Sequence, residues 1–228
     1  MIENITFTPV QMLGYLSCTV PFTVTACLDK EIQEMLDSNF ENATSYKNEL
    51  AGAIENEYRI EKSVSVIEEF IDEVVPNYWK AHKNYEQASK RHHIRFNDNK
   101  TRDIWVNFAK KGDYNPLHTH GGVLSFVLWY KIPYQIQNEK NQPNVRDGSI
   151  NPASSFIFNY PDFFSKGGVG QWSLPVDETW ENTMIIFPAV LQHCVYPFQT
   201  SDDYRISISG NIDLENTDRF VQQIGKET

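Results

Sequence analysis

The fold is decided by a stretch that starts with two histidines and runs into the longest apolar segment of the chain. It reads Asn115-Pro116-Leu117-His118-Thr119-His120-Gly121-Gly122, and residues 123–132 continue it as an almost uninterrupted apolar run. Side chains two residues apart in an extended strand project from the same face, about 6–7 Å apart along the chain. His118 and His120 can therefore both reach one metal ion.

Short β-like segments, punctuated by Gly and Pro, follow each other through the second half of the chain. Strands are predicted over residues 104–108, 123–132, 155–159, 171–174, 183–187, 192–196 and 205–208. Many short strands at spacings of about ten residues indicate a β-sandwich or barrel. In the last strand, the two-residue period puts Arg205, Ser207 and Ser209 on one face and two isoleucines on the other. The polar loop over residues 133–151 is predicted to be a lid or a partly disordered segment outside the core.

The first hundred residues show helical rather than strand periodicity. Apolar side chains recur at helical spacing over residues 63–87, with acidic residues on the other side, and Pro76 is predicted to kink or divide this helix. A shorter helix is predicted over residues 30–36, after an N-cap at Asp29 and a strand over residues 21–26. An apolar helix face needs a partner, most simply the outer face of a β-sheet.

No linker or low-complexity segment divides the chain, which predicts one domain over residues 1–228. We expect a helix-rich N-terminal part (1–100), a β-sheet core (103–212) and a C-terminal tail (213–228). The expected fold class is α+β, with the N-terminal helices packed on the outer face of the sheet.

Charge and composition restrict the class of function. The chain has 228 residues, of which 40 % are hydrophobic and 13 % aromatic, and a formal net charge of −10. This excess of acid argues against nucleic acid or an anionic membrane as a partner, because phosphate binding needs a basic patch. Three scattered cysteines, no secretory leader and no apolar run of about 20 residues predict a reduced, cytoplasmic protein without a membrane span. The sequence leaves the oligomeric state open.

A third histidine completes the set that a catalytic metal needs. His193 lies in the predicted strand over residues 192–196, and Arg205 follows it twelve residues later. Neutral imidazoles bind Fe, Zn, Ni and Cu, and three of them with open coordination positions suit a catalytic ion. Two alternatives stay open. The pair at positions 118 and 120 is an ordinary polar edge of the core, or Cys194 joins the ligands, although strand alternation turns it to the opposite face.

Arg205 is the candidate anchor for an anionic ligand. A guanidinium group binds a carboxylate through two parallel hydrogen bonds and keeps its charge when partly buried. A salt bridge to Asp202 or Asp203 is the alternative. The remaining histidines, at positions 82, 92 and 93, are predicted to be solvated. The sequence contains no glycine-rich nucleotide loop, serine-hydrolase elbow or zinc-protease motif.

Together these pieces resemble the 2-oxoglutarate/Fe(II)-dependent oxygenase superfamily, and more narrowly the oxygenase-like proteins of marine bacteria and their tailed phages. The resemblance rests on residues 115–122, 124–130, 187–188, His193 and residues 205–211, within a region from 103 to 212 that is about half the chain. It implies a double-stranded β-helix, which is a distorted jelly roll of the cupin-like type, with iron at its open end.

Position by position, the resemblance implies that His118 and His193 are iron ligands. It also implies that Arg205 binds the distal carboxylate of 2-oxoglutarate. Ser207 is a candidate second contact on the same strand face, and Tyr130 and Asn107 on neighbouring strands are weaker candidates for binding the co-substrate.

Position 120 departs from the wider superfamily, which has a carboxylate where this chain has His120. The narrower group is similar to this chain there, so His120 is kept as the third metal ligand. The exchange leaves the ion with one more positive charge, which favours an anionic co-substrate and changes the redox tuning of the metal.

The resemblance therefore implies a dioxygenase that uses Fe(II), O2 and 2-oxoglutarate. It would hydroxylate an unidentified substrate, such as a peptidyl side chain or a small molecule, and release succinate and CO2. Such an enzyme would work in the cytoplasm, or in that of the host if a phage encodes it. Two alternatives remain: a three-histidine cupin-type dioxygenase that does not use 2-oxoglutarate, and a non-enzymatic metal-binding or structural jelly roll.

Overall fold

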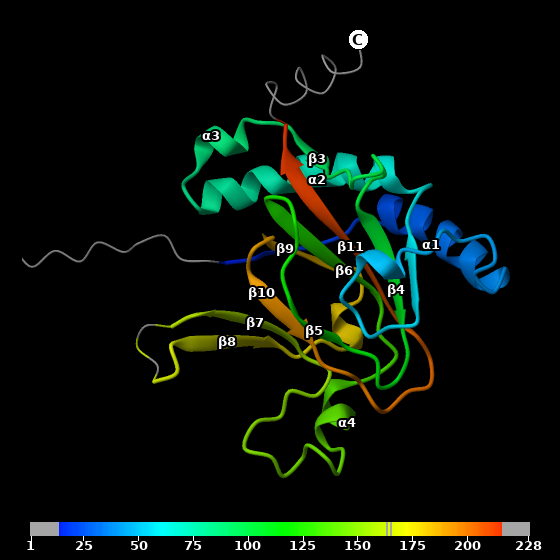
Figure 1. Cartoon of the computed structure of the whole chain (residues 1–228), viewed down its shortest axis with the longest axis vertical. Helices are drawn as coiled ribbons and strands as arrows, with labels where there is room; N and C mark the ends of the chain where they lie inside the picture. Colours follow the sequence, from blue (N-terminus) through cyan, green and yellow to red (C-terminus); the bar gives the residue numbers. More distant parts are fainter. Residues whose placement is uncertain (1–13, 163, 165, 216–228) are drawn as a thin grey trace, which may run out of the picture.

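Two antiparallel β-sheets pack against each other, and helices cover the outer face of the larger sheet (Figure 1). The computed structural model describes residues 14–162, 164 and 166–215. The larger sheet has the order β1 (Leu16–Thr19), β9 (Thr183–Pro188), β6 (Leu124–Lys131), β11 (Arg205–Leu214), β4 (Ile104–Ala109) and β2 (Asn56–Arg59), and β3 (His92–Ile94) also pairs with β11. The smaller sheet has the order β5 (Asn115–His118), β10 (Gln192–Val195), β7 (Phe156–Pro161) and β8 (Val169–Leu174).

The two long helices, α1 (Phe22–Asp37) and α2 (Val64–Ala81), bury their apolar stripes on the larger sheet. On α2 the stripe is made of Ile67, Ile71 and Val75, which share one face because the helix repeats every 3.6 residues. The sheet contributes Ile104, Val106, Phe108, Leu124, Phe126, Leu128, Met184, Ile186, Ile206, Ile208 and Ile212 to this core. Within the described residues, no helix has the length and apolar character that crossing a membrane requires.

A second apolar core lies between the sheets. It contains Val127, Trp129, Ile185 and Phe187 from the larger sheet and Phe156, Phe158 and Leu174 from the smaller one. Strand β11 separates the two cores. Its isoleucines belong to the helix side, whereas Arg205, Ser207 and Ser209 line a cavity between the sheets. The two-face prediction for this strand is confirmed.

The strand predicted over residues 21–26 is wrong, because α1 begins at Phe22, directly after Pro21. Proline suits the start of a helix, where its missing N–H group costs no hydrogen bond. The β-branched Val24 and Thr25 are buried on the inner face of the helix, so tertiary packing outweighs their local preference for a strand.

Several short elements depart from the sequence prediction. Strands β1, β2 and β3 have no predicted counterpart, because three or four residues are too few to show a period. Helix α2 continues through Pro76, and the separate helix α3 (Tyr85–Ala88) follows it. Two 3₁₀ turns, η1 (Lys47–Glu49) and η2 (Glu178–Trp180), complete the elements together with α4 (Ile136–Lys140).

His92 is buried in β3 rather than solvated. Its Nε2 accepts a hydrogen bond from Trp79 Nε1 at 2.8 Å, and desolvation lowers its pKa. The prediction of a solvated histidine fails because β3 pairs with β11 under the cover of α2, a contact that the local sequence does not show.

The loop over residues 133–151 is anchored by a buried carboxylate. Glu139 in α4 has 0 % of its surface exposed. It accepts hydrogen bonds from the backbone N–H groups of Gln199 and Thr200, both at 2.8 Å. The prediction that this loop lies outside the core is therefore wrong at Glu139, which ties the loop to the segment leading into β11.

Candidate metal centre

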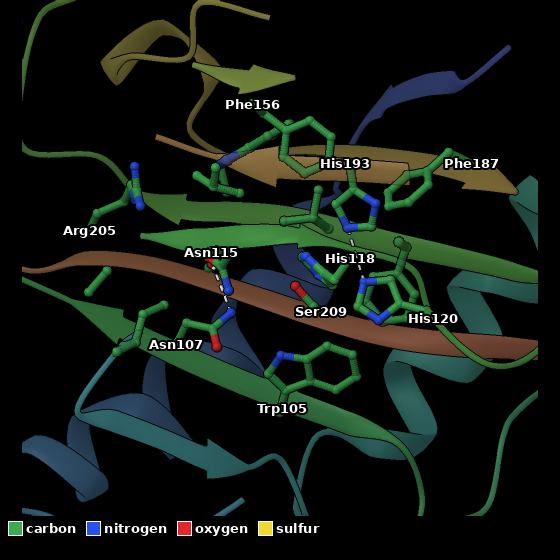
Figure 2. Close-up of a pocket in the computed structure, with 17 residues that line it drawn as sticks. Trp105, Asn107, Asn115, His118, His120, Phe156, Phe187, His193, Arg205 and Ser209 are labelled. Carbon is green, nitrogen blue, oxygen red and sulfur yellow. Dashed lines mark hydrogen bonds between the residues drawn. The ribbon is translucent and has the colours of Figure 1, made fainter. Parts of the chain in front are cut away.

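Strand pairing brings the three histidines together between the sheets. His118 is the last residue of β5, and the register places it directly opposite His193 of β10. His120 lies two residues further on, where its backbone N–H donates to the Ala189 carbonyl oxygen at 2.8 Å. One nitrogen from each imidazole lies within 4.8 Å of the others, and Figure 2 shows the three rings gathered at one place.

Backbone carbonyls orient two of these rings. The Nδ1 of His118 lies 2.7 Å from the Pro116 carbonyl oxygen, and the Nδ1 of His193 lies 2.9 Å from that of Leu191. A carbonyl oxygen only accepts, so each Nδ1 carries the proton and each Nε2 keeps its lone pair for the centre. Such a hydrogen bond also raises the basicity of a ligand histidine.

Burial keeps the three imidazoles neutral. Desolvation, followed by repulsion from the neighbouring imidazoles, lowers the pKa of His120 to about 2 and that of His193 to about 3. Desolvation also lowers the pKa of His118, although its hydrogen bond to Pro116 opposes the shift. Neutral imidazole is the form that binds metal ions.

The donor set fits a divalent transition-metal ion. His120 Nε2 and His193 Nε2 lie 3.1 Å apart, which is about the separation of two nitrogens bound to one ion at roughly 2.0–2.1 Å. Within the described part of the chain, the three histidines are the one group of His, Cys, Asp and Glu side chains close enough together to hold an ion. Imidazole suits Fe, Zn, Cu and Ni alike, so the set accepts iron without selecting it.

Aromatic rings pack around the histidines. The Phe156 ring stacks on His193 at a centroid distance of 5.2 Å, and the Phe187 ring meets it edge-on at 4.9 Å. The Trp105 ring lies 5.7 Å from His120. These aromatic rings pack against the imidazoles of His193 and His120 and form an apolar wall beside them.

The cavity between the sheets, called the inner cavity below, extends from the histidines to Arg205, with Asn107 and Asn115 between them in the view of Figure 2. Its apolar wall includes the Phe156 and Phe187 rings. The inner cavity therefore joins a set of neutral metal ligands to a cation.

Arg205 is only 4 % exposed and has no anionic partner among the described residues. Its Nη1 donates to Tyr134 Oη and to the Tyr196 carbonyl oxygen, both at 3.3 Å. The predicted alternative, a salt bridge to a neighbouring aspartate, does not form, and Asp202 pairs with Lys111 instead. A buried charge without a counter-ion is destabilising, so this guanidinium points to an anionic ligand.

Two of the further candidates for co-substrate contact line the inner cavity, and one does not. Asn107 Nδ2 donates to Ser207 Oγ at 3.3 Å, and Asn107 Oδ1 is buried without a partner in the described chain. Tyr130 lies on the helix side of β6, where its hydroxyl donates to Asp29 Oδ1 at 2.6 Å. The strand register determines the face on which Tyr130 lies. Trp129 is the residue of β6 that pairs with Ser207, so the next residue, Tyr130, points to the opposite face.

The acidic cluster at residues 55–57 predicts a solvated helix face, which is wrong at Glu57, a buried acid of strand β2 near the inner cavity. It pairs with Asn107 across β2 and β4, is 1 % exposed, and neither carboxylate oxygen has a hydrogen-bond partner in the described residues. A Cβ on Gly52 would lie 2.6 Å from Glu57 Oε1 and 2.9 Å from Asn115 Nδ2. Desolvation raises the pKa of Glu57 to about 7. Only the pairing of β2 with β4 reveals this residue.

Residues 103–211 match the model of a protein family described as "Putative 2OG-Fe(II) oxygenase". The matched segment contains the three histidines, Arg205, Asn107 and Ser207. A comparison with curated protein sequences finds no match.

Solved structures extend the comparison to the fold. A prolyl-4-hydroxylase from Pseudomonas putida is similar to this chain with a TM-score of 0.52 and 11 % identity, over 89 % of this chain and 94 % of the other. The non-heme alpha ketoglutarate dependent epimerase SnoN from nogalamycin biosynthesis has a TM-score of 0.46 and 12 % identity, over 88 % and 76 % of the two chains. At these identities the likeness to the hydroxylase concerns the fold alone.

Proposed function

We propose that this chain is an Fe(II)- and 2-oxoglutarate-dependent oxygenase whose iron is held by His118, His120 and His193. The observation that carries the proposal is the inner cavity, with three neutral imidazoles and a buried guanidinium that lacks an anion. A dicarboxylate that reaches from a metal ion to this cation has charges that match both ends. The family match over residues 103–211 supports the same conclusion.

In this proposal the two sheets form a double-stranded β-helix, and residues 1–228 act as one oxygenase domain. The antiparallel pairing of every strand, the shared core between the sheets and the likeness in fold to a prolyl-4-hydroxylase support it. Hydroxylation of a substrate is the reaction type we propose, by analogy of fold.

The side chains of the inner cavity have separate tasks. Arg205 binds the far carboxylate of 2-oxoglutarate, and its hydrogen bonds to Tyr134 and Tyr196 hold the guanidinium in position. Ser207 and Asn107 offer further hydrogen bonds between Arg205 and the histidines. The aromatic rings of the cavity wall make the surroundings less polar than water, which strengthens each polar contact inside. Bound iron supplies the oxidising chemistry, in which O2 and 2-oxoglutarate are consumed and succinate and CO2 are released.

His120 makes this centre more cationic than one with a carboxylate ligand. Three neutral imidazoles leave the charge of a divalent ion uncompensated, and Arg205 adds another positive charge to the same cavity. A doubly negative co-substrate offsets that excess. The charge balance of the cavity therefore favours 2-oxoglutarate over direct addition of O2 to a neutral substrate.

Arg205→Met tests this proposal, because methionine fills the space of the arginine stem without its charge. We expect about a 100-fold loss of succinate formation at low 2-oxoglutarate, since two charge-assisted hydrogen bonds disappear. The affinity for Fe(II) should be unchanged. Arg146→Met is the matched control, because Arg146 is exposed and pairs with Asp147 in the 133–151 loop.

Unchanged turnover of 2-oxoglutarate by Arg205→Met would contradict the assignment of the co-substrate site. Oxygen uptake that does not depend on 2-oxoglutarate would favour a cupin-type dioxygenase. A protein that binds no iron would favour a structural jelly roll.

A further inference from the structure

A second cavity, called the outer cavity below, adjoins the histidine end of the inner one. The two cavities share Trp105 and His120, and Arg205 lines the inner cavity alone. The outer cavity has a volume of about 450 Å³, against about 50 Å³ for the inner one. Small-molecule sites typically measure roughly 300–1,000 Å³. Of these two cavities, the outer one offers more space for a second substrate beside the metal centre.

Arg95 brings a positive charge into the outer cavity next to a proposed metal ligand. Its Nη1 lies 1.4 Å from the point where a Cβ on Gly121 would stand, so the guanidinium rests against the backbone that follows His120. The backbone of Arg95 is fixed by hydrogen bonds to Asn211 at 2.9 Å and from Asp103 at 2.7 Å. No carboxylate of the described residues pairs with this guanidinium.

The buried polar side chains on the wall of the outer cavity already form hydrogen bonds with each other or with neighbouring residues. Tyr46 Oη donates to Asp103 Oδ1 at 2.5 Å, and Asn211 Nδ2 donates to Asp103 Oδ2 at 3.4 Å. Asn211 in turn accepts from Ser125 Oγ at 2.8 Å. These groups form a polar scaffold, and the charges that remain available to a ligand belong to other residues.

The available charges of the outer cavity have both signs. Glu49 and Asp98 are exposed on its wall, and neither has an ion-pair partner within the described chain. Arg95 provides the cation of the same wall. A ligand with one carboxylate and one ammonium group matches this pattern, whereas a purely anionic or purely apolar ligand leaves charges unmatched.

We propose that the outer cavity binds the substrate to be oxidised, and that this substrate is a small zwitterion of the α-amino-acid class. Arg95 binds its carboxylate, and Glu49 and Asp98 bind its ammonium group. The substrate side chain then lies beside Trp105 and His120, next to the metal centre. The role as oxidised substrate rests on the proposed oxygenase function, whereas binding of the zwitterion requires no turnover.

Calorimetric titration of the anaerobic full-length protein tests the site without any reaction. The probes are the L-α-amino acids, each compared with its amide, which lacks the carboxylate, and its N-acetyl form, which lacks the ammonium group. We expect at least one amino acid to bind, and both modified forms to bind about tenfold or more weakly, because each loses one charge-assisted contact.

Two variants should weaken binding of that amino acid by about tenfold or more. Arg95→Gln removes the charge. Gly121→Ala displaces the guanidinium, and the fold should tolerate this change because the obstructing atoms are the mobile end of Arg95. Melting curves confirm that each variant is folded, and Arg146→Gln, outside both cavities, should bind like the wild type.

Three results would overturn the inference: no amino acid binds, the amide binds as tightly as the acid, or Arg95→Gln leaves the affinity unchanged. Binding of 2-oxoglutarate that depends on Arg95 rather than Arg205 would also overturn it, since the outer cavity would then be the co-substrate site. An amino acid that binds through Arg95 to a protein with no 2-oxoglutarate turnover would leave the zwitterion site intact and refute the proposed function instead.

Discussion

Glu57→Gln should change how the stability of the protein depends on pH. Glu57 is 1 % exposed, and neither carboxylate oxygen has a partner in the described residues. Desolvation is the main cause that raises its pKa, while Lys47 lowers the pKa and Asp113 raises it by smaller amounts. The substitution keeps the shape of the side chain and removes its titration.

The sign and size of the effect follow from the two pKa values of Glu57, which are 4.5 for an ordinary glutamate and about 7 in the folded protein. Between them, the folded state keeps a proton that the unfolded state has lost. The free energy of unfolding therefore falls as the pH rises through this window. The full difference corresponds to about 3 kcal/mol, present below pH 4.5 and lost above pH 7.

Urea denaturation at several pH values between 5 and 8 gives the free energy of unfolding of wild type and of Glu57→Gln. The effect is the difference between the two proteins in how this free energy changes with pH. The contribution of the buried histidines to the pH dependence cancels in this comparison, because both proteins contain them. Their lowered pKa values make the free energy of unfolding rise with pH, which is opposite to the effect of Glu57. Relative to the variant, the wild type should lose about 3 kcal/mol, or roughly 6–12 °C in Tm at this chain length. Glu69→Gln on the exposed face of α2 is the control. Parallel pH profiles for wild type and Glu57→Gln would refute the reasoning.

Two further substitutions test other parts of the protein. The His120→Asp variant should still bind iron, but its affinity for 2-oxoglutarate should be about three- to tenfold lower. The reason is that a carboxylate ligand removes one net positive charge from the cavity. A titration of the iron-loaded variant checks this, and equal or tighter binding would contradict it. Glu139→Gln should destabilise the protein by about 2–4 kcal/mol, because the charge-assisted hydrogen bonds from Gln199 and Thr200 are weakened. Thermal unfolding measures the loss, and an unchanged Tm would show that Glu139 does not anchor the loop.

The parts of the site that follow strand periodicity could be predicted from the sequence. The alternation along β11 places Arg205 and Ser207 on the cavity side without knowledge of the strand order. His120 lies beyond the end of β5, so strand periodicity alone does not explain how it reaches His118. The face on which Tyr130 lies could not be predicted in this way. Its face depends on the register of β6 against β11, which pairs Trp129 rather than Tyr130 with Ser207. A position on a neighbouring strand is therefore not enough to predict that a side chain reaches the inner cavity.

Features that arise from contacts distant in sequence could not be predicted. Glu57 looks like a polar residue of a loop, and its burial comes from the pairing of β2 with β4 and from the close approach of Gly52. His92 is likewise buried by β11 and α2. The position of Arg95 beside the metal centre depends on the fold, which brings the backbone at Gly121 against its guanidinium. In each case tertiary packing outweighs local composition.

We propose that the three histidines and Arg205 form one site for iron and 2-oxoglutarate. An anaerobic titration of Fe(II) and then 2-oxoglutarate into metal-free protein, followed by visible absorption, tests it most directly. We predict a broad charge-transfer band that appears only with both present and that requires about 100-fold more 2-oxoglutarate in Arg205→Met. Bound iron without such a band would contradict the co-substrate assignment, and a failure to bind iron would contradict the metal centre itself.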